Sequence, residues 1–377
     1  MENKKERTAP VLSVGADREQ PQLKNHNEII ANAGRQINPQ AAKSQEKTGT
    51  GVLQTVSMTE LYDTVYPPKM PVVDDFLFAG TYLFVGAPKV GKSFFMAQLS
   101  YHVSMGLPLW EYQTHKGTVL YLALEDDYAR LQRRLSTMFG VECADNLFFA
   151  TKAKTLNEGL DNQLEAFVQE HTDARLIIID TLQKIREIGG DRYSYASDYE
   201  IVTRLKAFSD RHNICLLIVH HTRKMESEDS FDMISGTNGL LGAADGAFIM
   251  QKKKRTDKTA SMDIVGRDQP DQRLTLEFEQ EHCIWQLTKA ETELWKEPPE
   301  PLLEQINQRL TADCPRWQGT ATELVGWLGV EMSPNSIARK LNVLYGRLLN
   351  EYGIFYRRDR CHEGRMIKLY RGVRDDM

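Results

Sequence analysis

Residues Gly86 to Ser93 constrain this chain more than any other stretch, because they set two glycines and a Lys-Ser pair at a fixed spacing. The run Gly-Ala-Pro-Lys-Val-Gly-Lys-Ser fills every required position of the pattern G-x-x-x-x-G-K-[ST]. Glycines at both ends of such a loop let successive backbone N–H groups point inward and form a cradle for phosphate. A buried strand is predicted over Thr81–Val85, and a helix pattern begins at Lys92. The motif predicts a nucleoside triphosphate site, and we disfavour the alternative of a plain glycine turn before a helix.

The residues of this loop have separate expected roles. Lys92 is expected to reach the β- and γ-phosphates, and Ser93 to ligate the Mg²⁺ that accompanies ATP. The helix that begins at Lys92 adds the positive end of its dipole to the anion cradle. The predicted nucleotide-binding residues of this stretch are Gly86, Ala87, Pro88, Lys89, Val90, Gly91, Lys92, Ser93 and Phe94.

Acidic residues follow a second predicted strand, Thr118–Leu124. Ligands of α/β sheets bind at the carboxyl ends of the strands, so Glu125 is a candidate general base. For Asp126 or Asp127 we favour a capping role, because carboxylates stabilise helix N-termini and a helix pattern covers residues 128–138.

Two further predicted strands end in polar side chains. The run Leu176–Ile179 leads into Asp180, an arrangement by which P-loop enzymes hold Mg²⁺ through a carboxylate or its water shell. Asp180 is therefore expected to bind the nucleotide and its metal. The run Ile214–Val219 ends in His220 and His221, next to the expected γ-phosphate position. One of them is a candidate phosphate sensor, whereas a packed or capping histidine is the alternative. A metal site is disfavoured, because no Cys or acid lies at ligand spacing.

Composition divides the chain of 377 residues into parts. Residues 1–57 are polar with few aromatics, so we predict a disordered tail. Over residues 58–295 strand-like and amphipathic segments alternate, which predicts an α/β domain with a largely parallel sheet flanked by helices. Three prolines in the charged stretch Trp295–Pro301 predict a stiff linker, and a smaller second domain is expected over residues 302–374.

Several features predict a cytosolic location and no membrane partner. No apolar run approaches the roughly 18 to 20 residues that span a bilayer. The charged N-terminus lacks the apolar stretch of a secretory signal, and five scattered cysteines without a C-x-x-C pair predict reduced thiols. The net charge of −5 does not exclude a nucleic-acid partner, because basic residues concentrate in one region.

The C-terminal domain contains a predicted basic helix. Ser333 and Pro334 are a suitable N-cap and first helical residue, and the helix is expected to extend to about Asn350. Apolar residues recur at three- and four-residue steps, so they form one buried stripe and leave cations available elsewhere on the helix. The stripe comprises Ile337, Leu341, Leu344 and Leu348, and the available cations are Arg339, Lys340 and Arg347.

A hairpin is predicted after this helix, from strands Ile354–Arg358 and Arg365–Arg371. Helices followed by such a hairpin indicate a winged-helix domain. Seven Arg or Lys between residues 354 and 374 face only Asp359 and Glu363, an excess suited to phosphate contacts. We therefore favour DNA binding by this domain over the alternative of protein contacts.

The order of these motifs resembles the RecA-like ATPases, and more closely the RepA-type replicative helicases of plasmids and mobile elements, with an AAA-type ATPase domain. The resemblance covers about residues 58–288. It rests on GAPKVGKS, YLALEDD, LIIIDTLQKI, IVHHTRK, ISGTNGLLGAADGAFIM and IVGRDQPDQRLTLEF, in that order.

The resemblance implies roles for several residues. Glu125 would activate the attacking water, and His221, with His220 as second choice, would sense the γ-phosphate. The family works as a ring, usually of six subunits, in which a basic finger from the neighbour completes each ATP site. Arg267 is the best match to that finger, and Lys254 and Arg255 are alternatives.

Two glycine-containing or polar stretches correspond to the channel loops of RecA-like rings, residues 186–192 and 223–232. The second contains four acids against Arg223 and Lys224, which would repel phosphates. Direct DNA binding through the second loop is therefore doubtful on the sequence.

Together these features predict a cytosolic, hexamer-forming, ATP- and Mg²⁺-dependent DNA helicase of the RepA type. A replication initiator or a primase is a possible partner. The rival classes are a DNA-binding ATP switch or helicase loader, and a small-molecule phosphotransferase, which is disfavoured because no arginine-bearing lid stands out.

Overall fold

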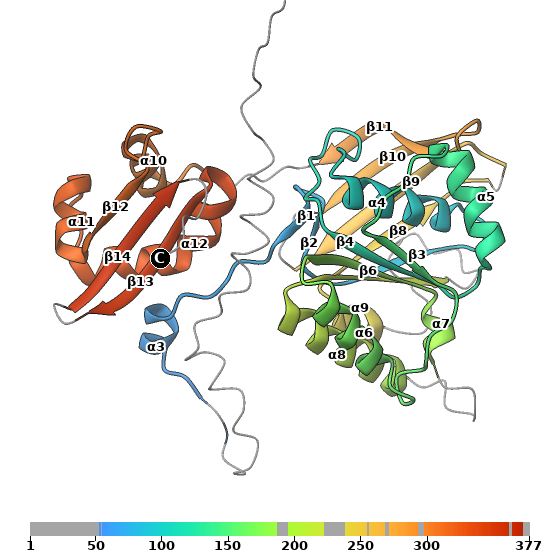
Figure 1. Ribbon diagram of the computed structural model, residues 1–377, viewed down its shortest axis with the longest axis horizontal. Coiled ribbons are helices and arrows are strands. Elements are labelled where there is room, and N and C mark those ends of the chain that lie inside the picture. The colour runs from blue at the N-terminus through green and yellow to red at the C-terminus, as the bar shows by residue number, and fades with distance from the viewer. Residues whose placement is uncertain are drawn as a thin grey trace, which may run out of the picture.

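The computed structural model describes residues 53, 55–186, 195–221, 238–254, 256–267, 271–292, 298–361 and 364–371. They form two lobes, a large α/β lobe and a smaller lobe near the C-terminus (Figure 1). The expected tail over residues 1–57 lies almost entirely outside the described residues, as do most residues of both predicted channel loops and Arg255.

The large lobe is built on a nine-stranded sheet in the order β11-β10-β9-β8-β3-β7-β6-β4-β5. Neighbouring strands from β8 to β5 in this order pair in parallel, which confirms the predicted mostly parallel α/β core. The parallel strands are β3 (Gly80–Gly86), β4 (Thr118–Ala123), β5 (Leu147–Ala150), β6 (Ala174–Asp180), β7 (Cys215–His221) and β8 (Gly246–Gln251). An antiparallel extension that the sequence did not predict consists of β9 (Thr259–Gly266), β10 (Gln272–Glu279) and β11 (Ile284–Thr292).

Helices cover both faces of the parallel strands, which explains why these strands are continuous apolar runs. One face packs against α4 (Lys92–Met105), α5 (Tyr128–Phe139) and the short hairpin of β1 (Pro71–Val73) and β2 (Leu77–Phe78). The other face packs against α6 (Leu160–Glu170), α7 (Leu182–Ile185), α8 (Tyr195–His212) and α9 (Asn238–Ala243). Successive residues of each strand therefore enter different halves of the core, and a side chain's place along a strand decides which face it reaches.

The small lobe packs three helices against a three-stranded antiparallel sheet of order β12-β14-β13. Its elements are α10 (Pro301–Arg309), β12 (Arg316–Thr320), α11 (Ala321–Leu328), α12 (Pro334–Tyr352), β13 (Ile354–Cys361) and β14 (Gly364–Arg371). The predicted cap is confirmed, because Ser333 Oγ accepts a hydrogen bond from Ser336 N at 3.2 Å and Pro334 is the first helical residue. The helix ends at Gly353, which adopts a left-handed conformation, and the hairpin follows as predicted.

The prediction that the cations of α12 stay available is wrong. Arg339 Nε donates to Asp63 at 3.0 Å, and Lys340 Nζ donates to Glu300 at 2.6 Å. Arg347 Nε donates to Glu351 at 2.6 Å. Acids far apart in the sequence therefore already engage these cations, which helical periodicity alone could not reveal.

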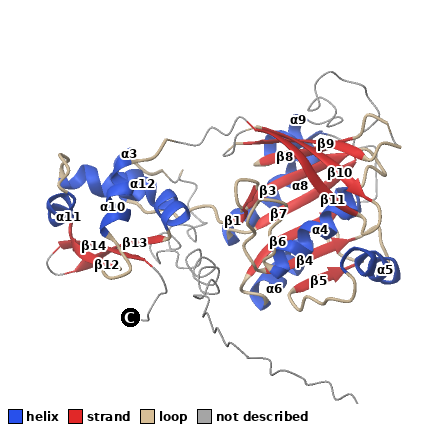
Figure 2. Ribbon diagram, turned by 90° about the horizontal axis from the view of Figure 1, so that it is seen from above, coloured by secondary structure: helices blue, strands red, loops and turns tan. Residues whose placement is uncertain are grey.

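One short helix from the N-terminal side belongs to this lobe as well. α3 (Met58–Asp63) begins at a capping box between Ser57 and Glu60 and packs against α12, although sequence patterns group it with the ATPase region (Figure 2). Asn342 Nδ2 donates to the carbonyl of Tyr62 at 2.7 Å. Across the described residues, no helix is long and apolar enough to cross a membrane.

Candidate functional site

The loop from Gly86 to Ser93 connects the end of β3 to the start of α4. Gly91 has φ of 109°, and a Cβ there would lie 2.7 Å from Trp285 of β11, so both conformation and space require glycine. A Cβ on Gly86 would lie 2.5 Å from the carbonyl oxygen of Met250. Sterics at both glycines thus hold the loop in the shape that a phosphate cradle needs.

Lys92 lies at the centre of the loop with only 5% of its surface exposed. Its Nζ donates to the carbonyl oxygens of Gly86 and Ala87 at 2.6 and 3.0 Å, and lies 3.0 Å from His221 Nδ1. Burial lowers the pKa of Lys92 to about 8, although the charges of Asp180 and Glu125 act in the opposite direction. An anion bound in the cradle would stabilise the charged form of this ammonium.

Asp180 ends β6 beside Ser93, where two hydroxyl groups donate to the same carboxylate oxygen. Ser93 Oγ and Tyr121 Oη each lie 2.9 Å from Asp180 Oδ2. Burial raises the pKa of Asp180, and the two hydroxyl donors oppose that shift. A carboxylate and a hydroxyl in contact are hard oxygen ligands of the kind that Mg²⁺ takes together with substrate phosphates. This pair therefore fits the predicted metal.

Glu125 follows β4 at the same edge of the sheet, and its side chain is 45% exposed. Thr181 Oγ1 donates to Glu125 Oε1 at 3.2 Å, and His221 Nε2 lies 3.8 Å from Glu125 Oε2. Both ring nitrogens of His221 thus face groups of the site, Lys92 on one side and Glu125 on the other. The pKa of His221 is lowered by burial first and by the charge of Lys92 second.

His220 points away from this group. Cys215, Leu217 and Val219 of β7 pack on the α4 face, so strand alternation sends His221 to that face and His220 to the other. His220 is buried, and burial lowers its pKa to about 4. Of the two predicted histidines, the structure brings His221 to the P-loop lysine.

Arg267 lies at the opposite edge of the sheet from the P-loop. Gly266 pairs with Gly246, the first residue of β8, whereas Met250 near the end of β8 pairs with Gly86. That separation is about 13 Å along the strand. The exposed Arg267 donates to the carbonyl of Gly242 and does not join the group around Lys92.

Lys254, the first alternative to Arg267, lies in the β8–β9 hairpin at the P-loop edge of the sheet. It is exposed, and its backbone N–H donates to Asp257 Oδ2 at 2.9 Å. Lys254 and Arg267 thus occupy opposite edges of the same sheet.

Phe94 packs next to the P-loop instead of opening into it. Its ring lies 5.4 Å from that of Phe278, and the Arg134 guanidinium lies 5.4 Å from its centroid. Arg134 also pairs with Asp126 at 2.7 Å, whereas Asp127 is the N-cap of α5. Of the two predicted capping acids, the structure thus assigns the cap to Asp127.

Three contributors to the site were missed from the sequence. Tyr121 reads as one more apolar residue of a buried strand, yet its hydroxyl reaches Asp180. Thr181 contacts Glu125, and only its position directly after Asp180 could have suggested this. Trp285 lies 194 residues from Gly91, and its Nε1 donates to the Gly91 carbonyl at 3.2 Å. No local pattern points to that contact.

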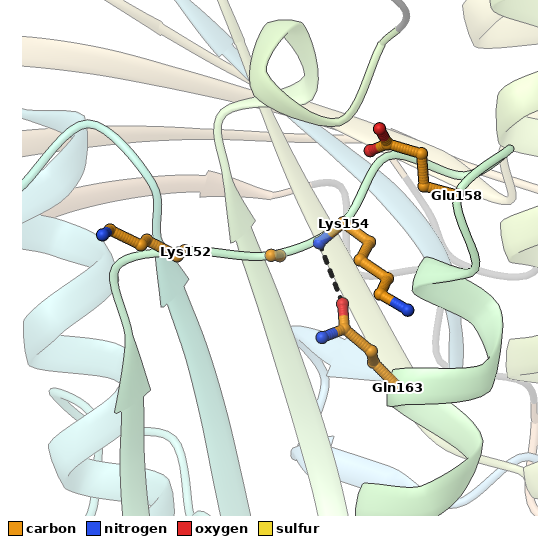
Figure 3. A pocket seen from close by; sticks show the side chains of 5 residues that line it. Lys152, Lys154, Glu158 and Gln163 are labelled. Carbon is orange, nitrogen blue, oxygen red and sulfur yellow. Dashed lines mark hydrogen bonds between the residues drawn. The ribbon is translucent and has the colours of Figure 1, made fainter.

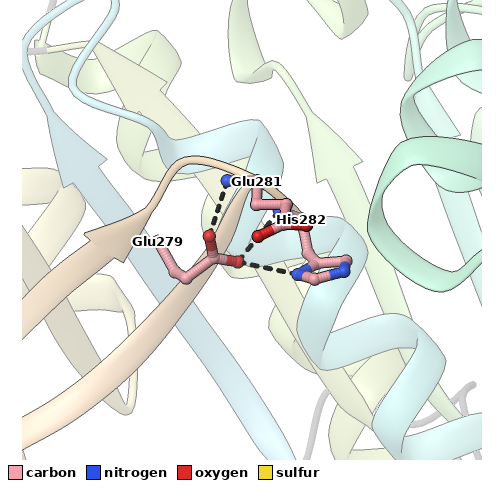
Figure 4. Close-up of side chains that lie close together, drawn as sticks. All are labelled: Glu279, Glu281 and His282. Atoms are coloured by element: carbon pink, nitrogen blue, oxygen red, sulfur yellow. Dashed lines mark hydrogen bonds and ion pairs between the residues drawn. The ribbon is translucent and has the colours of Figure 1, made fainter.

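Two other features lie apart from this group. A hollow after β5 is lined by Lys152, Ala153, Lys154, Glu158 and Gln163 (Figure 3). It is separated from β3 by β7, β6 and β4, or about 19 Å. Glu279, Glu281 and His282 cluster in the β10–β11 turn (Figure 4), where Glu279 accepts from the backbone N–H of both others. Those bonds account for the cluster as a closed turn.

Residues 49–227 match the profile of the AAA domain family. No curated protein matches the chain. Among solved structures, one determined as an isolated ATPase domain is similar at 14% identity and a TM-score of 0.47, over 56% of this chain and 85% of that one. A DnaB-like replicative helicase, solved with attention to its interactions with primase, is similar at 13% identity and a TM-score of 0.47, over 68% of each chain. Given the family match and the P-loop geometry, residues 49–227 carry an AAA-family ATPase domain of the RecA-like P-loop type.

Proposed function

We propose that this protein is an ATP-dependent DNA helicase of the RepA type, acting in the replication of a plasmid or other mobile element. The observation that carries the ATPase part is the convergence of Lys92, Asp180, Glu125 and His221 at one edge of the parallel sheet. Motif order from the P-loop to Arg267 carries the helicase part.

In the proposed reaction the cradle binds the triphosphate of ATP, and Lys92 moves from its carbonyl partners to the β- and γ-phosphates. Mg²⁺ held by Ser93 and Asp180 supplies neutralisation of the phosphate charge. Glu125 orients a water and accepts its proton as the water oxygen attacks the γ-phosphorus. The bond from that phosphorus to the bridging oxygen breaks, and ADP and phosphate leave.

His221 is the proposed link between the γ-phosphate and the rest of the domain. It lies between Lys92 and Glu125, so a movement of either group on phosphate binding or release changes its contacts. The chain after His221 continues into the acidic segment 223–232, which would transmit the change.

Arg267 is the proposed finger for a neighbouring subunit in a homo-hexameric ring. Its place at the sheet edge opposite the P-loop supports this role, because an arginine there is too far to serve its own site. In related enzymes such a finger stabilises the transition-state charge and contributes roughly 10³ to 10⁵ in rate.

The small lobe is the proposed DNA-binding winged helix. Its three helices and its sheet of order β12-β14-β13 support this assignment, and so does the excess of cations on β13 and β14. A replication initiator or a primase is the proposed protein partner.

ATP hydrolysis with and without single-stranded DNA tests the proposal. Lys92→Ala and Arg267→Ala should each be inactive, and a mixture of the two should regain part of the activity, because mixed interfaces combine an intact cradle with an intact finger. Strong stimulation by DNA supports a helicase. Slow hydrolysis that DNA leaves unchanged favours a DNA-binding ATP switch or helicase loader, to which the acidic segment 223–232 already points. Undiminished hydrolysis by Lys92→Ala would refute the site.

A further inference from the structure

The attachment of α3 to the small lobe is slight. None of the side chains of Met58–Asp63 is buried, and Leu61 and Tyr62 remain exposed. The main polar contacts to α12 are the 2.7 Å bond from Asn342 to the Tyr62 carbonyl and the pairing of Asp63 with Arg339. A helix held by so few contacts can be displaced at small cost.

Asp63 lies among three arginines from three different elements. Arg339 Nε of α12 donates to Asp63 Oδ1 at 3.0 Å, and Arg365 Nη1 of β14 lies 3.7 Å from Asp63 Oδ2. The hydrogen bond from Arg339 lowers the pKa of Asp63, and the charges of Arg339, Arg358 and Arg365 lower it further. Asp63 is thus ionised in the position where an external anion would bind.

Strand alternation explains why the arginines converge. Tyr356 of β13 and Ile367 of β14 point into the core beneath α12. Arg358 is two residues beyond Tyr356, and Arg365 is two residues before Ile367, so both lie on the same face as that core, near its rim. The opposite face of the hairpin carries its own closed group, in which Asp359 pairs with Arg357 and Lys368.

One carboxylate does not satisfy this arginine group. Three guanidinium groups against one carboxylate leave an excess of two positive charges. Within the described part of the chain, Arg358 Nε and Nη1 are buried and have no hydrogen-bond partner. A phosphate offers more acceptor oxygens than a carboxylate, and arginine forks match its geometry.

We propose that Arg339, Arg358 and Arg365 form a binding site for the phosphate backbone of a nucleic acid, and that Asp63 occupies this site while α3 lies on α12. The inference rests on the proposed DNA binding of the small lobe and adds the residues that bind and the segment that competes. A nucleic acid strand replaces the single carboxylate of Asp63 with a phosphate, and α3 leaves the helix.

Binding of labelled single-stranded and duplex oligonucleotides to the full chain, followed by fluorescence anisotropy without nucleotide, tests the site. Asp63→Asn removes the competing charge, so affinity should rise about 5- to 10-fold and its salt dependence should steepen by about one unit in log–log slope. Arg339→Gln should lower affinity below that of the unmodified protein. Basal ATP hydrolysis without DNA should stay unchanged in Asp63→Asn.

Asp359→Asn is the matched control, because it removes the same charge from the opposite face of the same hairpin. An equal rise in affinity for Asp359→Asn would reduce the effect to net charge and overturn the proposal. An unchanged affinity in Asp63→Asn, with binding by the unmodified protein, would overturn the competition by α3 while leaving DNA binding intact. If neither the unmodified protein nor Asp63→Asn binds either oligonucleotide, the DNA-binding function of the lobe fails as well.

Discussion

Replacement of Tyr121 by Phe isolates one hydroxyl that supports Asp180. Tyr121 is fully buried in β4, and its Oη donates to Asp180 Oδ2 at 2.9 Å. Phe keeps the ring and its packing, including the contact with Phe149 at 5.8 Å between centroids. The substitution therefore leaves Asp180 with the Ser93 hydroxyl as its remaining donor among the described contacts.

The expected cost follows from burial. Hydrogen bonds to charged groups contribute about 1.5–3 kcal/mol. Part of this loss falls on the ground state, so we take the lower end and expect kcat/KM for ATP to fall about 10-fold at neutral pH. The pKa of Asp180, which burial already raises, should rise further when a donor to the ionised form is lost. The acid limb of the activity profile should consequently move to higher pH.

Steady-state ATP hydrolysis of Tyr121→Phe across a pH series, at several Mg²⁺ concentrations, gives the result. Tyr356→Phe is the matched control, because it removes another buried tyrosine hydroxyl, whose 2.7 Å partner is the neutral Asn342 in the small lobe. Tyr356→Phe should leave the acid limb in place. If Tyr121→Phe keeps full activity and an unshifted acid limb, the hydroxyl does not support the ionised carboxylate and the reasoning is refuted.

Three other substitutions or conditions give further expectations. His221→Ala should lose most ATP hydrolysis while His220→Ala retains it, because only His221 reaches the P-loop; equal losses in the steady-state assay would contradict this. Trp285→Ala should destabilise the large lobe by about 3–5 kcal/mol in denaturant unfolding, since it empties a fully buried space against Gly91; a midpoint unchanged from the parent would contradict this. Burial lowers the pKa of Lys92 to about 8 from its ordinary value of 10.5, so the nucleotide-free protein binds fewer protons than the unfolded chain between those two pH values. Its stability should therefore rise with pH in that window, and this rise should disappear in Lys92→Ala when unfolding is followed at several pH values.

Much of the site was readable from the sequence because its parts are local. The P-loop is a continuous run, and Glu125, Asp180 and His221 each lie at or just after the end of a strand. Parallel strands bring their carboxyl ends to one edge of the sheet, so residues far apart in the chain meet without any long-range information beyond strand order. The helix after Ser333 and the hairpin after Gly353 were predictable for the same local reason, through caps and periodicity.

The tertiary structure decided what depends on register and on contacts between distant segments. Strand alternation selected His221 over His220, and the antiparallel register moved Arg267 to the edge opposite the P-loop. Arg339 and Asp63 are 276 residues apart, yet their pairing converts cations that a helical wheel leaves free into an occupied anion site. By itself the sequence determined which groups stand at strand ends and helix caps, because those positions follow from neighbours along the chain. Only the packing of whole elements decided which charges face one another, because many pairings satisfy the same local pattern.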